Sequence, residues 1–155
     1  MDVRWHASPN FGARRNGLRP TLVVIHYTAM KSCQAALDRL CDPVAEVSSH
    51  YLISEKGDIL QLVEEDQRAW HAGQSEFRGR ERCNDFSIGI ELEGTDTLAY
   101  SDAQYAVLAA LVAALRAAYP TLHAAPIVGH SDIAPGRKTD PGPAFDWSRL
   151  DTLQP

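Results

Sequence analysis

Two histidines and one aspartate have residue types and positions that suit a metal site. His26 and His130 each end an apolar run that predicts a buried strand, and Asp140 follows ten residues after His130 in a loop rich in proline. Ligand sites of open α/β sheets lie beyond the carboxyl ends of the strands. Two imidazoles and one carboxylate leave a fourth position open for water, as in catalytic zinc sites. The sequence has no CxxC or HExxH motif, so the spacing alone is also compatible with two structural histidines.

A carboxylate and a lysine could serve the same site. Glu91 alternates with apolar residues between positions 86 and 93, which predicts that it faces the open side of a half-buried strand. There it could act as general base beside a metal-bound water. Lys138 lies two residues before Asp140 and could stabilise an oxyanion. The alternatives are an ordinary surface lysine and a solvated strand face, and the latter is the interpretation of Glu93.

Other histidines give weaker signals. His71 lies in the segment Ala69–Gly73 and could contact a substrate, whereas its neighbour Trp70 is expected in the core. His50 lies in a predicted strand and is expected to be structural, with a position along a cleft as the alternative.

The arginines between positions 78 and 82 and the three cysteines carry no pattern that predicts a catalytic role. Arg78, Arg80 and Arg82 are expected to be solvated loop charges, with recognition of carboxylates as the alternative. Cys33 and Cys41 would lie about 12 Å apart on one predicted helix, beyond the reach of a disulfide. The three cysteines of the sequence are therefore expected to be reduced, as in the cytoplasm.

These side chains require a scaffold in which strands and helices alternate. The longest predicted helix begins at Ser101, where Gln104 completes a capping box, and ends before Pro120. Residues 1–20 are expected to form an irregular arm, and residues 74–85 an exposed loop. Strands are predicted at 21–26, 48–54, 59–63, 86–93 and 126–130, and helices at 32–41, 101–119 and 145–150. The predicted fold class is α/β, with a central mixed sheet flanked by helices in one domain spanning 1–155.

Composition excludes several classes of function. The chain has 155 residues, of which 45% are hydrophobic and 23% charged, and its formal net charge is −5. An acidic chain is poorly suited to bind nucleic acid or anionic lipid without specific contacts. It has no apolar run of the length that spans a membrane, and no apolar signal segment at its N-terminus. We expect a cytoplasmic monomer.

Five segments, taken in order, resemble the zinc-dependent N-acetylmuramoyl-L-alanine amidases. They are Val24–His26, Ser49–Ile53, Arg68–Gly73, Asn84–Gly94 and Gly129–Pro143. The resemblance covers about residues 20 to 150 and implies a mixed sheet with a zinc cleft along one edge.

The resemblance also implies a role for each residue of the candidate site. It makes His26, His130 and Asp140 the ligands of one Zn²⁺. It implies that Glu91 transfers the proton of the attacking water, and that Lys138 stabilises the tetrahedral intermediate.

Residues 79–100 and 130–147 look specifically like the AmpD-type branch of this family, whose members are cytoplasmic amidases of cell-wall recycling. The likeness implies hydrolysis of the bond between the lactyl group of N-acetylmuramic acid and L-alanine in 1,6-anhydro-muropeptides. It implies that Arg82 and Arg137 bind the peptide stem. Tyr27 and His71 complete the expected substrate contacts.

The segment from 27 to 49 departs from that branch because it is shorter, and in this it is more like the broader-specificity AmiD-type relatives. We therefore expect a weaker preference for the anhydro sugar. One alternative function is a broader-specificity peptidoglycan amidase or a small lysin that acts on polymeric wall. Another is a non-catalytic peptidoglycan-binding module, but the presence of all three ligand positions together with Glu91 and Lys138 argues against it.

Overall fold

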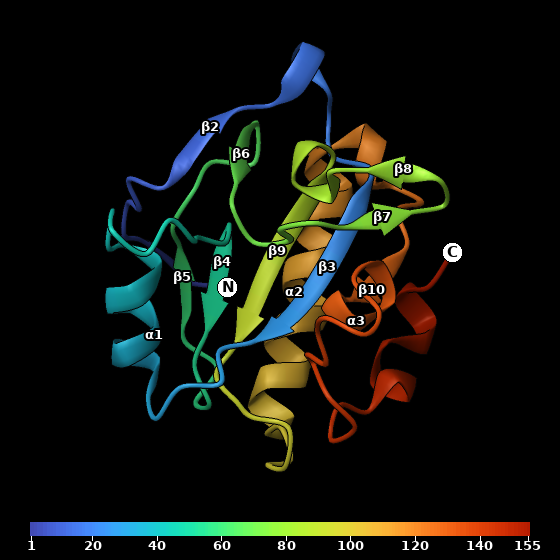
Figure 1. Ribbon diagram of the computed structural model, residues 1–155. Coiled ribbons are helices and arrows are strands. Elements are labelled where there is room, and N and C mark those ends of the chain that lie inside the picture. Colours follow the sequence, from blue (N-terminus) through green and yellow to red (C-terminus); the bar gives the residue numbers. More distant parts are fainter.

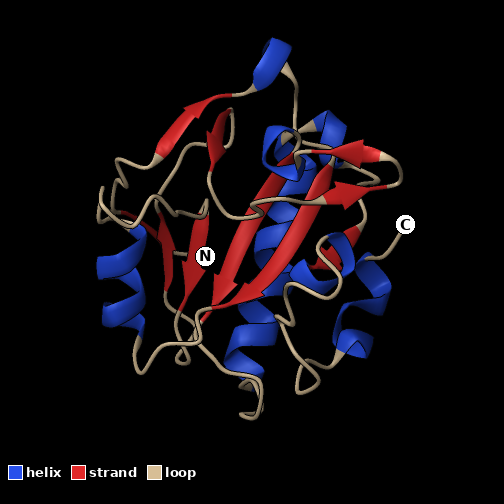
Figure 2. Ribbon diagram, in the orientation of Figure 1, coloured by secondary structure: helices blue, strands red, loops and turns tan.

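A six-stranded mixed sheet forms the centre of the computed structural model, which describes residues 1–155 (Figures 1 and 2). All neighbouring strands are parallel except β4 and β5, which form an antiparallel hairpin. The carboxyl ends of β4, β9, β3 and β10 therefore meet at one edge. In order across the sheet the strands are β1 (Val3–Trp5), β5 (Ile59–Gln61), β4 (Tyr51–Ile53), β9 (Ser87–Leu92), β3 (Leu22–Tyr27) and β10 (Ile127–Gly129). This confirms the predicted fold class.

The two central strands, β3 and β9, are buried on both faces, as is typical of parallel strands. The expectation that residues 86–93 form a half-buried strand was therefore wrong. Ser87 and Gly89, on the face expected to be open, are both buried. Loops distant in sequence cover them, and a Cβ atom on Gly89 would lie 2.4 Å from the ring of His71.

Helix α2 (Asp102–Ala118) covers one face of the sheet and lies behind β3 and β9 in Figure 1. The predicted capping box between Ser101 and Gln104 is present, so the sequence placed the start of this helix correctly. The short helices η3 (Pro120–Leu122) and η4 (Trp147–Leu153) follow in the same layer. The core between helix and sheet includes Val23, Ile25, Ile88, Ile90, Leu108, Leu111, Val112, Leu115 and Leu150.

Shorter elements cover the other face. Helix α1 (Cys33–Leu40) begins at the N-cap Ser32 and buries Ala36, Leu37 and Leu40 against Leu52. The remaining elements are β2 (Phe11–Ala13), η1 (Arg15–Gly17), β6 (Gln67–Ala69), β7 (Glu76–Phe77), β8 (Arg80–Glu81), η2 (Cys83–Asp85) and α3 (His130–Ile133). No helix has both the length and the apolar character that crossing a membrane requires.

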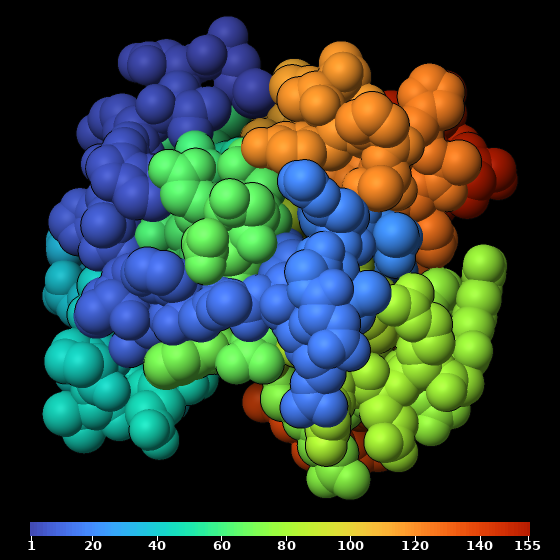
Figure 3. Space-filling model, turned by 90° about the horizontal axis from the view of Figure 1, so that it is seen from above, coloured from blue at the N-terminus to red at the C-terminus, as the bar shows by residue number.

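Two segments that were expected to be irregular are ordered by backbone pairing. In the N-terminal arm, β1 joins the main sheet and β2 pairs with β6, so the blue N-terminal segment lies against the green segment around β6 (Figure 3). Residues 74–85 form the β7–β8 hairpin and η2, with Ser75, Cys83 and Asp85 buried. Strands of two or three residues carry too little hydrophobic periodicity to be found in a sequence. The predicted last helix, 145–150, is a 3₁₀ helix at Trp147–Leu153.

Arg14, which no pattern in the sequence singles out, connects the arm to the sheet. Its guanidinium is buried and donates hydrogen bonds to four main-chain carbonyls, those of Glu65, Asn84, Asp85 and Ser87. Burial lowers the pKa of Arg14 to about 10, against the opposing effect of nearby carboxylates, so the side chain stays charged at neutral pH.

Replacing Arg14 with methionine should destabilise the protein strongly. The variant keeps the aliphatic volume but leaves several buried carbonyls without this donor, and each such loss costs about 1–3 kcal/mol. We expect the free energy of unfolding in urea to fall by at least ~3 kcal/mol. The matched control is Arg19→Met, because Arg19 is exposed and has no hydrogen-bond or ion-pair partner; it should change stability by less than ~0.5 kcal/mol. Equal stability of the two variants would contradict this role of Arg14.

Candidate active site

The sheet brings His26 and Glu91 side by side. The two residues are partners in the β3–β9 register, near the carboxyl ends of both strands. His130 follows directly after β10, the other neighbour of β3, and begins α3. Asp140 returns to the same place because its carbonyl accepts the main-chain N–H of Ser131 at 3.0 Å. Strand pairing thus collects residues that lie far apart in the sequence.

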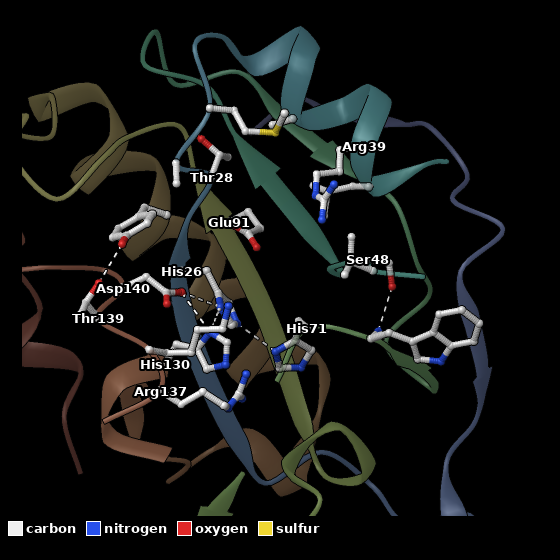
Figure 4. A pocket seen from close by; sticks show the side chains of 18 residues that line it. His26, Thr28, Arg39, Ser48, His71, Glu91, His130, Arg137, Thr139 and Asp140 are labelled. Atoms are coloured by element: carbon white, nitrogen blue, oxygen red, sulfur yellow. Dashed lines mark hydrogen bonds and ion pairs between the residues drawn. The ribbon is translucent and has the colours of Figure 1, made fainter. Parts of the chain in front are cut away.

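His26, His130 and Asp140 form one buried cluster, as Figure 4 shows. The Nδ1 atom of His26 lies 3.0 Å from Nδ1 of His130 and 2.9 Å from Oδ2 of Asp140, and the third separation is 3.1 Å. The outer nitrogens are already used: Nε2 of His26 contacts His71, and Nε2 of His130 contacts the carbonyl of Ala72.

The surroundings shift the pKa of this cluster. Burial, as the largest effect, lowers the pKa of His26, which favours the neutral ring that a metal ligand requires. Burial alone would raise the pKa of Asp140, but its contacts with His130 and His26 hold it below its ordinary value. The aspartate is therefore ionised at neutral pH.

The donor set fits a divalent metal such as zinc. Tetrahedral zinc with bonds of about 2.0–2.1 Å separates its ligand atoms by about 3.3 Å, close to the separations between the two Nδ1 atoms and Oδ2. Two imidazoles and a carboxylate also leave a fourth position for a reactant, the pattern of catalytic sites. The spatial group that the sequence predicted is thus present.

The cluster lies in a cavity of about 420 Å³ (Figure 4). Its wall on the α1 side is largely apolar, and the opposite wall carries the cluster and the loop with Lys138. The lining residues are His26, Tyr27, Thr28, Ala29, Met30, Ala36, Arg39, Leu40, Val47, Ser48, Trp70, His71, Glu91, His130, Arg137, Lys138, Thr139 and Asp140. A pocket with one apolar wall and a few convergent polar groups is typical of small-molecule sites.

Glu91 points into this cavity and not to a solvated strand face (Figure 4). Its Oε2 atom is buried and has no hydrogen-bond partner. Burial raises the pKa of Glu91 well above its ordinary value, Asp140 adds to the rise, and Lys138 opposes it. A carboxylate with such a pKa and an unused oxygen can exchange protons with a bound reactant.

Glu93 was expected to be a solvated carboxylate, and this was wrong. Its oxygens accept the main-chain N–H groups of Cys33, at the start of α1, and of Glu55, at 2.9 and 2.8 Å. Glu93 therefore serves the fold, and Glu91 is the carboxylate of this strand that faces the cavity.

Lys138 and Tyr27 also line the cavity, and Tyr27 is hydrogen-bonded to the loop that carries Lys138. The main chain of Lys138 donates to the carbonyl of Ala134, and its side chain lines the cavity. The Tyr27 hydroxyl donates to Thr139 at 2.8 Å, and Thr139 donates to Asp96 at 3.1 Å. These bonds hold the loop that carries Lys138.

His71 lines the cavity, whereas Trp70 does not lie where the sequence suggested. Both ring nitrogens of His71 bond within the protein, to His26 at 2.9 Å and to Ser87 at 3.0 Å, so neither is free to bind a substrate. Trp70 is half-buried and lines the cavity, and is not a core residue. His50 is structural, as predicted, and lies behind the cavity wall, where its Nδ1 accepts the main-chain N–H of Gly89.

The two arginines expected to bind a peptide lie in different surroundings. Arg137 lines the main cavity and also a second, polar hollow of about 650 Å³, and donates to the carbonyls of Ala72 and Gln74 at 2.7 Å. Arg82 is exposed and lines the second hollow but not the main cavity. The structure therefore places Arg82 outside the cavity of the cluster, in a hollow that adjoins it through Arg137.

Some residues of the site gave no signal in the sequence. Arg39, in the last turn of α1, lines the cavity, although the pattern of α1 identifies only its apolar face. Asn84 and Ser87 shape the site from behind, through hydrogen bonds to the loop at His71.

Arg80, interpreted as a solvated charge, stacks on the ring of Phe86 at 3.9 Å. All three cysteines are free, and burial raises the pKa of the Cys83 thiol.

The amino-acid sequence matches the family described as N-acetylmuramoyl-L-alanine amidase over residues 16–143. It is 50% identical to the 1,6-anhydro-N-acetylmuramyl-L-alanine amidase AmpD of Escherichia coli K12, over 94% of this chain and 88% of that protein. The aligned length of 163 positions exceeds the length of this chain, so the relative carries residues that are missing here.

Two solved structures are also similar. A crystal structure of a selenomethionine derivative of AmpD has a TM-score of 0.87 and 44% identity, over all of this chain and 96% of that one. The complex of AmiD from Escherichia coli with the substrate anhydro-N-acetylmuramic acid-L-Ala-D-γ-Glu-L-Lys has a TM-score of 0.78 and 40% identity, over 90% of this chain and 59% of that one.

Proposed function

The chain belongs to the N-acetylmuramoyl-L-alanine amidase family, and we propose that it hydrolyses the bond between the lactyl group of N-acetylmuramic acid and L-alanine in 1,6-anhydro-muropeptides. The observation that carries this proposal is the buried His26–His130–Asp140 cluster, with an unpartnered oxygen of Glu91 in the same cavity. The similarity of the chain to AmpD over nearly its whole length supports the same substrate class and a role in recycling the cell wall.

We propose that Nδ1 of His26, Nδ1 of His130 and Oδ2 of Asp140 hold one zinc ion. When bound, zinc lowers the pKa of a coordinated water toward neutrality and attracts electrons from a carbonyl oxygen. The three protein ligands carry one formal negative charge, because both imidazoles are neutral ligands and Asp140 is ionised. The site would thus keep a net positive charge that favours an oxyanion.

Glu91 and Lys138 would act on the two ends of the reacting amide. Glu91 is proposed to take a proton from the attacking water and to give it to the alanine nitrogen, because an amine is a poor leaving group until it is protonated. Because burial raises its pKa, the carboxylate of Glu91 is a stronger proton acceptor than that of an exposed glutamate. The ammonium of Lys138 is proposed to stabilise the negative charge that forms on the amide oxygen. This path needs no thiol nucleophile.

Two regions flank this centre and would bind the two ends of the substrate. Arg137, at the junction of the cavity and the second hollow, and Arg82, within the hollow, are proposed to bind carboxylates of the peptide stem. The apolar wall with Met30 and Trp70 is left for the sugar. Tyr27 borders the cavity at the loop of Lys138 and would contact the substrate there. We propose that the chain acts as a cytoplasmic monomer, and its three free cysteines support the proposed compartment.

Protein purified without added metal should contain one zinc per chain. Removal of the metal with a chelator should abolish hydrolysis, and zinc should restore it. Asp140→Ala should lose the metal, whereas His123→Ala should keep it, because His123 is exposed and lies outside the cavity. Elemental analysis measures both. An active protein without metal would refute the zinc proposal.

Glu91→Gln and Lys138→Met should bind zinc as the natural protein does but lose turnover by about 10²–10⁴-fold, the usual effect of removing a proton-transfer or oxyanion group. The control is Glu93→Gln, which should lower thermal stability through its lost main-chain bonds and leave turnover nearly unchanged. A larger loss of turnover in the Glu93 variant than in the Glu91 variant would show that Glu91 is not the base.

The protein should cleave anhydro-muropeptides with a weaker preference for the anhydro sugar than AmpD has. The short segment 27–49 supplies one wall of the cavity, so fewer contacts would distinguish the two ring forms. Each tenfold loss of discrimination corresponds to ~1.4 kcal/mol of transition-state binding. The measurement is kcat/KM for matched anhydro and reducing-end muropeptides, with intact sacculi as a third substrate. A preference as strong as that of AmpD would show that this segment does not set the choice of sugar.

A further inference from the structure

We infer that the dipeptide His71–Ala72 sets the tautomers of both metal-facing histidines, and that His71 is a positioning residue of the metal centre. The inference rests on the proposed metal site. It extends that site to residues that are not metal ligands.

The argument for His26 starts at a main-chain carbonyl. The carbonyl of Cys83 can only accept, so Ser87 Oγ donates its one proton to it, at 2.6 Å. The same Oγ lies 3.0 Å from Nε2 of His71 and must accept there, which places a proton on that nitrogen. Nδ1 of His71 is then the acceptor in the 2.9 Å contact with His26 Nε2. His26 therefore carries its proton on Nε2, and its Nδ1 lone pair faces Asp140.

The argument for His130 is shorter. Its Nε2 lies 2.8 Å from the carbonyl of Ala72, which can only accept, so the proton of this ring is also on Nε2. The Nδ1 lone pair of His130 then faces His26 and Asp140. One side chain and the next carbonyl thus leave both Nδ1 atoms free for a cation.

The dipeptide is itself held in place. The side-chain carbonyl of Asn84 accepts the main-chain N–H groups of His71 and Ala72, at 3.0 and 2.8 Å. The ring of His71 packs on Gly89, where any Cβ would lie 2.4 Å from it. The opposite tautomer of His71 would leave the Cys83 carbonyl without the Ser87 proton. Such a loss typically costs about 1–3 kcal/mol in a buried site.

The tautomers can be measured without metal. Long-range ¹H–¹⁵N correlation spectra of the metal-free protein should show a proton on Nε2 of His26, His71 and His130. His50 is an internal reference, because its Nδ1 accepts the N–H of Gly89 and its Nε2 lies 3.0 Å from the carbonyl of Gln67. A His26 ring with its single proton on Nδ1 and none on Nε2 would overturn the inference.

A matched pair of variants tests the effect on metal binding. In His71→Asn the amide oxygen can take the place of the Nδ1 acceptor, whereas leucine in His71→Leu has nearly the same shape and no acceptor. Competition with a chelator should show zinc binding about 10–100-fold weaker in the leucine variant, and within a few-fold of the natural protein in the asparagine variant. Equal affinity of a folded leucine variant and the natural protein would refute the role of His71.

A third variant covers the case in which leucine prevents folding. Ser87→Ala removes the acceptor that fixes the tautomer of His71, so it should weaken zinc binding and shift the His26 signal toward the Nδ1–H form. An unchanged spectrum and affinity in this variant would overturn the inference. Absence of zinc binding in the natural protein would instead refute the proposed metal site, and the tautomers measured without metal would still decide the role of His71.

Discussion

The pairing of β3 with β9 is the interaction on which the rest of the structure depends. It places His26 beside Glu91, and the pairing of β3 with β10 brings His130 to the same edge. Because both central strands are buried on both faces, a polar side chain can be used there only if the protein itself provides its partners. One face of the sheet carries apolar side chains, which pack on the apolar side of helix α2 and need no polar partners. The other face carries the polar residues of the site, and its cover must be polar as well.

That polar cover explains why stability and chemistry share the same residues. Arg14 binds carbonyls on three segments that surround the site, and Asn84 holds the loop at His71. The carbonyl of Ala72 accepts both His130 and Arg137. A buried network of this kind is stable only while all its members are paired. The one buried side-chain oxygen left without a partner is that of Glu91, the group to which we assign proton transfer.

The sequence predicted the elements that carry long apolar patterns. The strand at β3, the capped helix α2 and the ends of strands at His26 and His130 could be found because burial and caps leave local signals. Three-residue strands such as β1 pair through the backbone and leave none. The alternation in β9 predicted an open face, because the loops that cover it come from elsewhere in the sequence. Arg14 was missed, and the hydrogen-bond partners of His71 were not foreseen, for the same reason: these partners are main-chain carbonyls and distant rings, which no periodicity reports.

The arrangement also separates chemistry from specificity. The groups proposed to act on the amide lie on β3, β9 and the loop at 138–140, which the sheet and its polar cover hold rigidly. The walls that would meet the sugar and the peptide come from other segments: α1 and Trp70 on one side, the hollow with Arg82 on the other. Shortening the segment from 27 to 49 changes one of these walls and leaves the pairing of β3 and β9 intact. Such a change should alter which substrates bind productively, because transition-state contacts to the sugar are lost, while the proton transfer and oxyanion stabilisation at the amide continue.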